Sequence, residues 1–498
     1  MTVLFNSFSF LIFFPIVALA YFALPHRVRN VWLLVASYYF YMSWNPKYAI
    51  LIAVSTVATW GTGLLLERLG RDAPPVQRKL WLVACLALNL GILFFFKYYH
   101  FAMTNLGAAL RPFGISFQAP AFDVVLPVGI SFYTFQALGY VIDVYRGEMK
   151  AERSLWRYAL FISFFPQLVA GPIERSKNLM GQMYERHDFD AKRVRDGLLL
   201  MGWGFFEKLV LADRIALLVT EVFDNYPNHT GVEIVMATVL FAFQIYCDFG
   251  GYSDIAIGAA RVMGFRLMKN FNSPYYATTV SDFWRNWHIS LTTWFRDYVY
   301  IPLGGNRCSR WKWCRNLLVT FSLSGLWHGA SWNFVVWGGL NGLYQVIGKL
   351  TEPFRTAVKS RLGIRTNCAS YRFFQRAITF ILVDFTWLFF RAKGFMAAVQ
   401  MIRQTIFNFG PLSLLNPETL LGITTVGMNE KDFLVMLVGL AVLCLVDYFR
   451  PQVDLKAALD RQNLVFRYFV YYVMLFTVLI FGIYGPEYDA SAFIYFQF

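Results

Sequence analysis

Charged side chains are scarce in this chain. Asp, Glu, Lys and Arg make up 15% of its 498 residues, and hydrophobic residues make up 57%. Soluble domains average about a quarter charged residues, so this composition excludes a soluble globular protein. Several windows of about 18–22 apolar residues are long enough to cross a hydrocarbon core of ~30 Å. The windows are continuously apolar rather than alternating every second residue, which predicts helices as the spanning elements.

Several functional signatures are also missing. The six cysteines are scattered and include no Cys-x-x-Cys pair, which argues against a disulfide or a metal site. There is no Gly-x-Ser-x-Gly elbow, phosphate-binding loop or His-Glu-x-x-His zinc motif. No repeat of fixed period is present, which weighs against a secondary transporter. The segment Met1–Leu24 lacks a charged start and a small-residue cleavage site, and we expect it to be a first span rather than a signal peptide.

Apolar periodicity and length predict an all-α polytopic integral membrane protein, in one domain covering residues 1–498. We expect about 11–13 transmembrane or re-entrant helices. The candidate spans are 5–24, 31–44, 48–66, 80–96, 124–144, 156–173, 197–222, 233–260, 316–329, 332–350, 373–390, 432–449 and 467–485.

The net charge of +15 is explained by basic loops on the cytoplasmic side, a more common cause than nucleic acid binding. Loops 25–30, 67–79, 146–155 and 351–372 are rich in Arg and Lys and are predicted to be cytoplasmic. That assignment makes 97–123 an extracytoplasmic loop.

The topology counted from the N-terminus and that counted from the C-terminus disagree between residues 155 and 285. Three apolar segments lie there, but an even number is needed to return the chain to the same side of the membrane. One of these segments is therefore expected to re-enter the membrane, or 197–222 to lie partly flat. Pro166 with Gly171-Pro172 supports a break, as do the charged pairs Glu207-Lys208 and Asp213-Arg214. Irregular backbone at membrane depth is tolerated where it lines a cavity, so the centre of the chain is a candidate for a pore, a tunnel or a buried site.

The stretch Ser281–Arg315 combines Arg and Lys with interleaved Trp residues. One interpretation is an interfacial amphipathic helix, because Trp settles at the membrane surface and Arg snorkels to it. The other is a cationic, aromatic-walled mouth for an anionic ligand that bears phosphates, since Arg binds phosphate with two hydrogen bonds and Trp stacks on bases. Pro302-Leu-Gly-Gly-Asn306 adds backbone that a ligand can approach closely.

Two histidines are candidates for chemistry. His328 lies twelve residues beyond Asn316, or about 18 Å at 1.5 Å per residue, which is near the middle of a bilayer. It is either a histidine bonded within the helix bundle or a general base that takes a proton from a hydroxyl nucleophile. His288 is either an interfacial surface histidine or a second base, an orienting partner or an oxyanion donor. Trp327 would help to keep the pocket dry. The other four histidines, at 26, 100, 187 and 229, are expected to be solvated in loops.

The segment Gln244–Asp254 places two carboxylates, Asp248 and Asp254, in or beside an apolar region. Carboxylates at such depth must pair or face water. They could orient a histidine or a cationic site residue, or they could hold the bundle together.

The stretch Asp282-Phe-Trp-Arg-Asn-Trp-His-Ile-Ser290, continuing to Arg307, followed by Leu326-Trp-His-Gly-Ala330, closely resembles the membrane-bound O-acyltransferase family. The similarity is greatest to its bacterial branch of alginate and peptidoglycan O-acetyltransferases. Further segments resemble the same branch: Leu4–Phe8, Leu126–Tyr133, Ala170–Pro172, Tyr246–Asp254 and Phe493–Phe498.

The resemblance implies a helical fold around a central tunnel, with a thin wall between a cytoplasmic and an extracytoplasmic cavity. It implies His328 as the essential catalytic histidine and His288 as the second histidine of the signature. It also implies an acyl donor from the cytoplasm, an acceptor hydroxyl outside, and a separate extracytoplasmic transferase or esterase-like subunit as partner.

We therefore expect an O-acetyltransferase of the bacterial cytoplasmic membrane, with acetyl-CoA as the expected donor. It would move the acetyl group to a hydroxyl of an extracytoplasmic polysaccharide or to a partner transferase. No metal and no permanently bound cofactor are expected. The expected donor-binding residues are Trp284, Arg285, Trp287, Arg296, Asn306 and Arg307, and the expected supporting residues are Asp248, Asp254 and Trp327. Two alternatives stay open: D-alanyl transfer to teichoic acid, and a transporter or flippase of a polyanionic lipid-linked sugar. The sequence does not choose among alginate, peptidoglycan and cellulose as acceptor.

Overall fold

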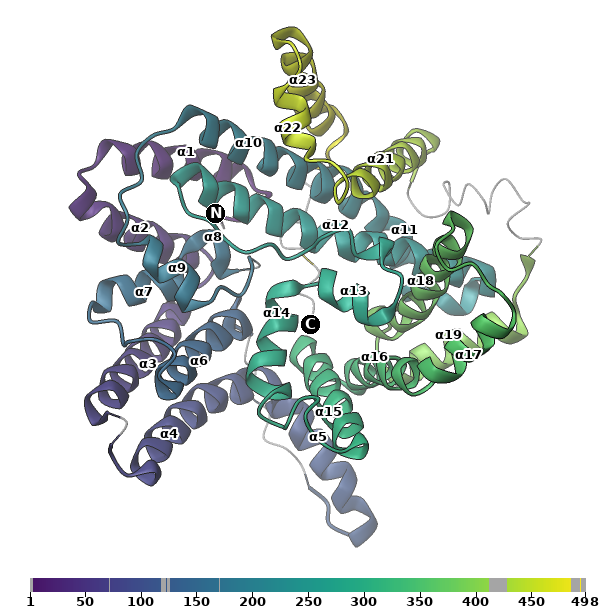
Figure 1. Ribbon diagram of the computed structural model, residues 1–498, viewed down its shortest axis with the longest axis horizontal. Helices are drawn as coiled ribbons and strands as arrows, with labels where there is room; N and C mark the ends of the chain where they lie inside the picture. Colours follow the sequence, from purple (N-terminus) through teal and green to yellow (C-terminus); the bar gives the residue numbers. More distant parts are fainter. Residues whose placement is uncertain are drawn as a thin grey trace. The chain divides into compact units, whose positions relative to one another are not determined.

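The computed structural model describes residues 3–70, 72–117, 122, 126–169, 171–411, 428–484 and 493. Every regular element in these residues is a helix, so the all-α prediction is confirmed (Figure 1). Six helical stretches of the described chain are long and apolar enough to cross a membrane, which makes the protein a multi-pass membrane protein. They are Pro46–Leu69, Pro75–Phe113, Gly231–Met263, Ala369–Arg391, Glu430–Phe449 and Leu464–Phe481.

By its internal packing the chain divides into two compact units. The first unit comprises 1–201, 253–268 and 490–497, and the second comprises 202–252, 269–489 and residue 498. The single domain predicted from the sequence stays a prediction.

In the first unit the most extensive helix contacts join helices that are not adjacent in the sequence: α3 with α6, α2 with α7, and α4 with α6. Local caps define several of their ends; the Ser7 side chain, for example, accepts a hydrogen bond from the Phe10 amide at 3.2 Å and starts α1. The elements are α1 (Phe8–Ala23), α2 (His26–Met42), a 3-10 turn (Pro46–Tyr48), α3 (Ala49–Leu69), α4 (Pro75–Leu93), a π-helical turn (Phe94–Tyr98), α5 (Tyr99–Leu110), a 3-10 turn (Arg111–Phe113), α6 (Ile130–Arg146), α7 (Leu155–Ser163), α8 (Phe165–Leu168), α9 (Ser176–Gln182) and most of α10 (Ala191–Phe205), with the last part of α12 (Gly231–Met263).

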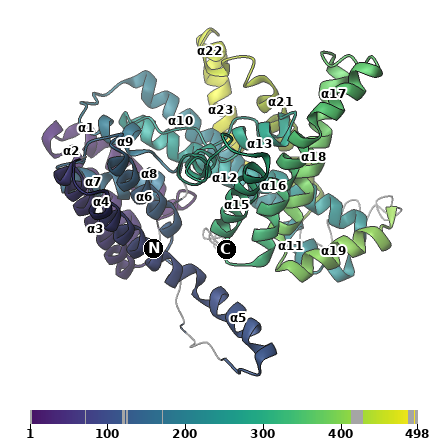
Figure 2. The ribbon, with the colours of Figure 1, turned by 60° about the horizontal axis from the view of Figure 1, so that its bottom comes forward.

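The predicted loop 97–123 is wrong as far as residue 113. Helix continues without interruption from Pro75 to Phe113, over 39 residues, and Figure 2 shows α5 extending away from the other helices of this unit. The polar residues Lys97, His100 and Asn105 lower the hydropathy there, but none of them breaks a helix. At about 1.5 Å per residue the stretch is about 58 Å long, which exceeds the thickness of a hydrocarbon core.

The predicted break near Pro166 is confirmed. Candidate span 156–173 forms the nine-residue helix α7 and the four-residue helix α8, with extended backbone at Phe164 between them. Nine residues of helix rise only about 14 Å, too little to cross the hydrocarbon core.

The sequence analysis expected His187 to be solvated, and this prediction is wrong. Its side chain is buried, its ring lies 4.8 Å from that of Phe265, and its Nε2 lies 2.9 Å from the Gln182 carbonyl oxygen. Arg29 also donates to the His187 carbonyl oxygen. The loop is therefore packed against the first unit by contacts between segments far apart in the sequence.

The second unit contains the remaining helices. Its elements are a π-helical segment (Phe206–Ala212), α11 (Asp213–Asp224), a 3-10 turn (Tyr226–Asn228), most of α12, a 3-10 turn (Pro274–Tyr276), α13 (Val280–Asn286), α14 (Ile289–Phe295), a π-helical turn (Arg296–Tyr300), α15 (Arg310–His328), α16 (Trp332–Leu350), α17 (Glu352–Arg361), α18 (Ala369–Arg391), α19 (Phe395–Phe407), α21 (Glu430–Phe449), α22 (Leu455–Asp460) and α23 (Leu464–Phe481).

The charged pairs predicted to disturb span 197–222 lie at its π-helical segment, where they are buried and paired. Lys208 Nζ lies 2.7 Å from Asp213 Oδ1 and 2.6 Å from Asp248 Oδ1. Arg214 lies 3.2 Å from Asp432 and also donates to the Phe481 carbonyl oxygen. Lys208 and Arg214 therefore each have an opposite charge beside them, whereas the buried Glu207 accepts a hydrogen bond from Trp203 Nε1 at 2.8 Å. These partners make the burial of the charges tolerable.

Helices α15 and α16 form a tight hairpin, and they make the most extensive helix–helix contact in the chain. A Cβ placed on Gly325 would lie 2.1 Å from the Phe334 carbonyl oxygen, and one on Gly338 would lie 2.1 Å from that of Phe321. Glycine is required at both positions because the two backbones touch, as in other close helix pairs in membranes. His328 is the last residue of α15 and lies directly before the turn of this hairpin.

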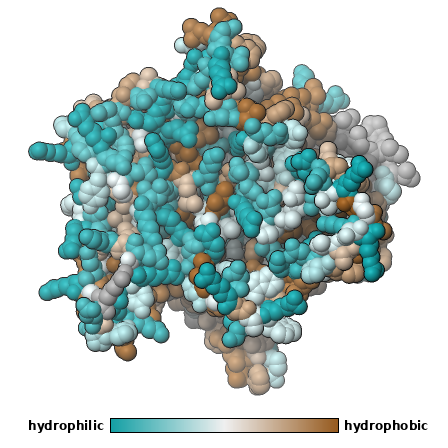
Figure 3. All heavy atoms as spheres, in the orientation of Figure 1, coloured by the Kyte–Doolittle hydropathy of each residue, from teal (hydrophilic) through white to brown (hydrophobic). Residues whose placement is uncertain are grey.

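Hydrophobic side chains are abundant on the surface of the spanning helices. None of the residues of α23 is buried, and Phe469, Tyr472 and Ile480 are among its exposed side chains. Figure 3 shows hydrophilic side chains over much of the visible face and hydrophobic ones mainly toward its rim. Helices exposed in this way present the surface that lipid tails cover.

Candidate active site

His288 lies at a sharp backbone turn between α13 and α14. Its φ of 43° places it in the left-handed region, which only one other non-glycine residue of the described chain, Ser273, also enters. The turn is fixed by a remote segment, because the Ile289 amide donates to the Asn270 carbonyl oxygen and the Asn272 amide donates to that of Asn286. A strained conformation held by such contacts is frequent at functional sites.

The His288 side chain is 1% exposed and is oriented by polar neighbours. Its Nδ1 donates to Asn270 Oδ1 at 3.2 Å, and the Ser290 hydroxyl donates to the same oxygen at 2.7 Å. The Phe249 ring packs edge-on at 4.6 Å. Burial lowers the pKa of His288 to about 3, so the imidazole is neutral near pH 7.

The structure brings the two signature histidines together. Their ring centroids are 6.3 Å apart. His328 is 5% exposed, and its ring makes edge contacts with Trp327 at 5.0 Å, Trp337 at 5.1 Å and Phe390 at 5.3 Å. Two imidazoles in a mostly aromatic surrounding, with little access to water, form a site where a proton can be accepted and returned.

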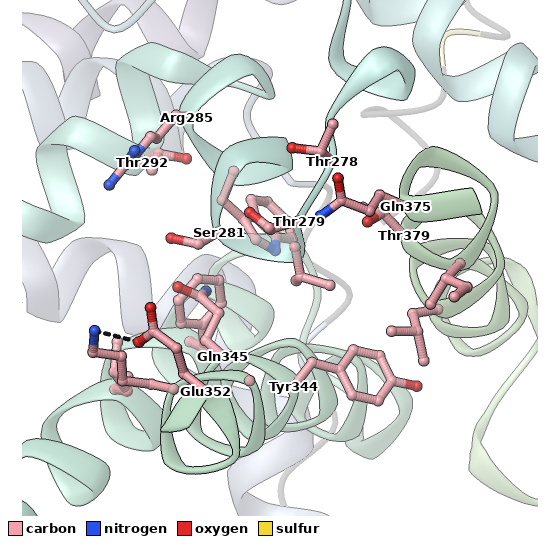
Figure 4. A pocket seen from close by; sticks show the side chains of 18 of the residues that line it. Thr278, Thr279, Ser281, Arg285, Thr292, Tyr344, Gln345, Glu352, Gln375 and Thr379 are labelled. Carbon is pink, nitrogen blue, oxygen red and sulfur yellow. Dashed lines mark hydrogen bonds and ion pairs between the residues drawn. The ribbon is translucent and has the colours of Figure 1, made fainter. Parts of the chain in front are cut away.

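A cavity of about 1080 Å³ lies in the second unit. Its wall is built from the start of α13, from α14 and the following turn, and from α15, α16, α17 and α18. Figure 4 shows the hydroxyl and amide side chains of Thr279, Ser281, Gln345 and Gln375 reaching it from different helices. The volume is sufficient for a ligand of cofactor size.

The charges on the cavity wall are strongly unbalanced. Five cationic side chains line it, against the single carboxylate of Glu352, and that carboxylate pairs with Lys349 at 2.6 Å. The cations are Arg285, Arg296, Lys349, Arg355 and Lys359. Aromatic rings of Trp313, Tyr344 and Tyr371 share the wall. Such a wall suits an anionic ligand that carries phosphates and a flat ring system.

Four of the six residues predicted to bind the donor line this cavity: Trp284, Arg285, Arg296 and Asn306. Trp287 and Arg307 are not among its lining residues. Trp287 is 2% exposed and stacks on Phe283 within an aromatic cluster, whereas Arg307 lies exposed in the loop before α15. The stretch 281–315 is therefore broken into most of α13, α14 with the π-helical turn after it, a loop and the first residues of α15, and is not one interfacial helix.

Neither histidine is among the residues that line the cavity. A chain of ring contacts links the wall to His328. Trp284 lines the cavity and packs edge-on against Trp337 at 5.6 Å, and Trp337 in turn packs edge-on against His328. Trp327, predicted to support the site, is 3% exposed and contacts both imidazoles.

The two carboxylates predicted to support the site lie in different units. Asp248 forms an ion pair with the buried Lys208, as a carboxylate that holds the helix bundle together would. The next residue along the chain, Phe249, contacts the His288 ring. Asp254 is half-buried in the part of α12 that belongs to the first unit.

Sequence reasoning missed three cations of the cavity, Lys349, Arg355 and Lys359. The signal was present for Arg355 and Lys359, because they lie in loop 351–372, which was recognised as basic, whereas Lys349 lies at the end of candidate span 332–350. The loop contains helix α17, and spacings of three and four residues put Glu352, Arg355 and Lys359 on the face that lines the cavity. Asn270, Asn341 and Trp337 carried no distinctive pattern and were also missed.

Comparisons with known proteins agree with this geometry. The family model "MBOAT, membrane-bound O-acyltransferase family" matches residues 152–390. A probable alginate O-acetylase, AlgI, of Pseudomonas putida is 36% identical over 99% of this chain and 99% of its own length. A peptidoglycan O-acetyltransferase of Helicobacter pylori is 32% identical over 80% of this chain and 79% of its own. A teichoic acid D-alanyltransferase of Bacillus subtilis is 29% identical over 44% of this chain and 58% of its own.

Proposed function

Because the chain belongs to the membrane-bound O-acyltransferase family and is an acyltransferase, we propose that it transfers acetyl from acetyl-CoA to a hydroxyl of an extracytoplasmic polysaccharide. The transfer is either direct or passes through a partner transferase subunit. The observation that carries this proposal is the imidazole pair at 6.3 Å, separated by one aromatic pair from a cavity with an excess of cations.

The cavity supports the choice of donor. Coenzyme A carries several phosphate charges, an adenine ring and a flexible arm with two amides. Five cations match the phosphates, aromatic rings match the adenine, and hydroxyl and amide side chains such as Thr379 and Gln345 match the arm. Loop 351–372, which contributes Arg355 and Lys359 to the cavity wall, was predicted to be cytoplasmic, the side on which acetyl-CoA is made.

His328 acts as the general base in this mechanism. The acceptor hydroxyl oxygen attacks the thioester carbonyl carbon while the His328 imidazole takes the hydroxyl proton. The new C–O bond forms, the C–S bond breaks, and the proton passes from His328 to the leaving sulfur, so that CoA departs as a thiol. His288, held neutral and oriented by Asn270, stabilises the negative charge that develops on the carbonyl oxygen or assists the proton transfer.

The names of the similar proteins support a polysaccharide acceptor. Alginate O-acetylases cover nearly the whole of this chain, and a peptidoglycan O-acetyltransferase covers four fifths of it. Acceptors of that kind lie outside the cell, and we therefore expect the protein to act in the bacterial cytoplasmic membrane, between the donor and the acceptor.

The test is acetyl release in vesicles. We expect purified protein in lipid vesicles to release free CoA from labelled acetyl-CoA when an acceptor polysaccharide is present, whereas a flippase would release none. His328→Ala should abolish this release while the protein still inserts, and His100→Ala, in exposed α5, should keep the wild-type rate. Wild-type acetylation by the His328→Ala protein would refute the mechanism.

A further inference from the structure

We propose that Trp284 and Trp337 form a size barrier that limits the transferred acyl group to acetyl. The inference rests on the proposed function and adds the specificity-determining residues of the donor. It follows from the aromatic pair that lies between the donor cavity and His328.

The two indoles occupy the place where a reacting acyl group must come close to His328. Trp284 belongs to the wall of the cavity and is 6% exposed, and Trp337, which touches the His328 ring at 5.1 Å, is 1% exposed. Phe390 packs on both Trp337 and His328, at 5.1 and 5.3 Å, and closes the side of this cluster. We infer that a thioester in the cavity approaches the imidazole beside these indoles.

Trp284 is held in place by a hydrogen bond. Its indole Nε1 donates to Asn341 Oδ1 at 3.2 Å. Asn341 is fully buried and is itself fixed, because its amide donates to Thr386 Oγ1 at 3.1 Å and to the Trp337 carbonyl oxygen at 2.9 Å. Asn341 is thus a positioning residue for Trp284, whose indole has little freedom to turn aside.

A barrier fixed in this way discriminates by volume. Packed aromatic interiors accept an additional methylene only by displacing a side chain. Acetyl places one methyl group beyond the carbonyl carbon, and propionyl adds one methylene. In apolar pockets one methylene changes specificity by about 10- to 200-fold. Shortening an indole to a phenyl ring should therefore admit propionyl.

The experiment compares acetyl-CoA, propionyl-CoA and butyryl-CoA with the full-length protein in vesicles. The wild type should prefer acetyl over propionyl by at least about tenfold in kcat/KM. Trp284→Phe and Trp337→Phe should each reduce that preference about tenfold or more. Asn341→Ala should also reduce it, because it removes no ring but frees the Trp284 indole to move. Trp387→Phe is the matched control, because Trp387 stacks on Trp337 at 5.6 Å but contributes neither to the cavity wall nor to a ring contact with His328 in the described residues.

The ratio of two donors does not depend on how much of a variant folds. For a variant too slow to assay, binding of acetyl and propionyl analogues with a CH2 group in place of the thioester sulfur gives the same ratio. An unchanged acetyl preference in both tryptophan variants would overturn the barrier, as would equal relaxation in Trp387→Phe. In either case acetyl transfer by the wild type would leave the proposed function intact, whereas a wild type that transfers no acetyl group would overturn the function itself.

Discussion

Helix α17 offers a direct test of how the donor's phosphates are recognised. Arg355 and Lys359 line the cavity, and Arg361, two residues further along the same helix, does not. The perturbation is Arg355→Gln with Lys359→Gln, and the matched control is Arg361→Gln. All three changes remove one positive charge from the same short helix.

The magnitude follows from exposure. A hydrogen bond to a charged group contributes about 1.5–3 kcal/mol, but Arg355 is exposed and Lys359 is half-exposed, so solvent reduces the contribution to about 1 kcal/mol each. Since 1.4 kcal/mol corresponds to tenfold, each change should raise KM for acetyl-CoA about 5-fold, and the pair about 30-fold. Glu352→Gln should have the opposite sign, because it removes the only carboxylate from the wall and releases Lys349.

The assay measures KM for acetyl-CoA and for acetyl-pantetheine, which lacks the nucleotide and all of the phosphates. The loss in the double variant should appear with acetyl-CoA and be nearly absent with acetyl-pantetheine, and it should shrink as salt is raised. Equal losses with both donors, or an Arg361→Gln protein as impaired as Arg355→Gln, would refute the assignment of phosphates to this helix.

Three further predictions concern the fold around the site. Gly325→Ala should lower the thermal unfolding midpoint strongly, because its methyl group would meet the Phe334 carbonyl oxygen, whereas Gly339→Ala, whose nearest neighbour would be 3.6 Å away, should leave it unchanged; equal midpoints would contradict the backbone contact of α15 and α16. Lys208→Met should destabilise the protein by about 3–5 kcal/mol, because two buried carboxylates lose their shared cation, and adding Asp248→Asn should recover part of the loss in a denaturation series. The lowered pKa of His288 means that, as pH falls, the unfolded chain binds a proton at this residue before the folded protein does, so the free energy of unfolding should decrease from about pH 6.5 toward 3. His288→Asn should flatten this pH dependence between pH 7.5 and 5. Parallel curves of unfolding free energy against pH for the wild type and the variant would contradict the prediction.

The fold was predictable wherever hydropathy acts alone. The windows 432–449 and 467–485 correspond closely to α21 and α23, and Pro166 correctly marked a break. Hydropathy failed where polar residues lie in a helix that continues, as at Lys97. It also could not predict the π-helical segment Phe206–Ala212, whose charges are stabilised by partners on distant helices.

The candidate site was predictable in its chemistry more than in its construction. The two histidines were recognisable from their surrounding motifs, and the structure places them together. The left-handed turn at His288 depends on Asn270, which no local pattern marks. The proposed barrier depends on Trp337 and Asn341 of α16. In the sequence these two residues are only parts of an apolar span, and their role becomes visible when α13 packs against α16.

The hairpin of α15 and α16 has a consequence for how the protein enters the membrane. Both of its outer ends are basic, with Arg310, Lys312 and Arg315 at one and Lys349 at the other, and its turn is short and uncharged. We expect these basic flanks to stay on one side of the membrane, so that the two helices enter it together with the turn leading. The depth of the His328 ring beside that turn would then be determined during biosynthesis by the length of α15.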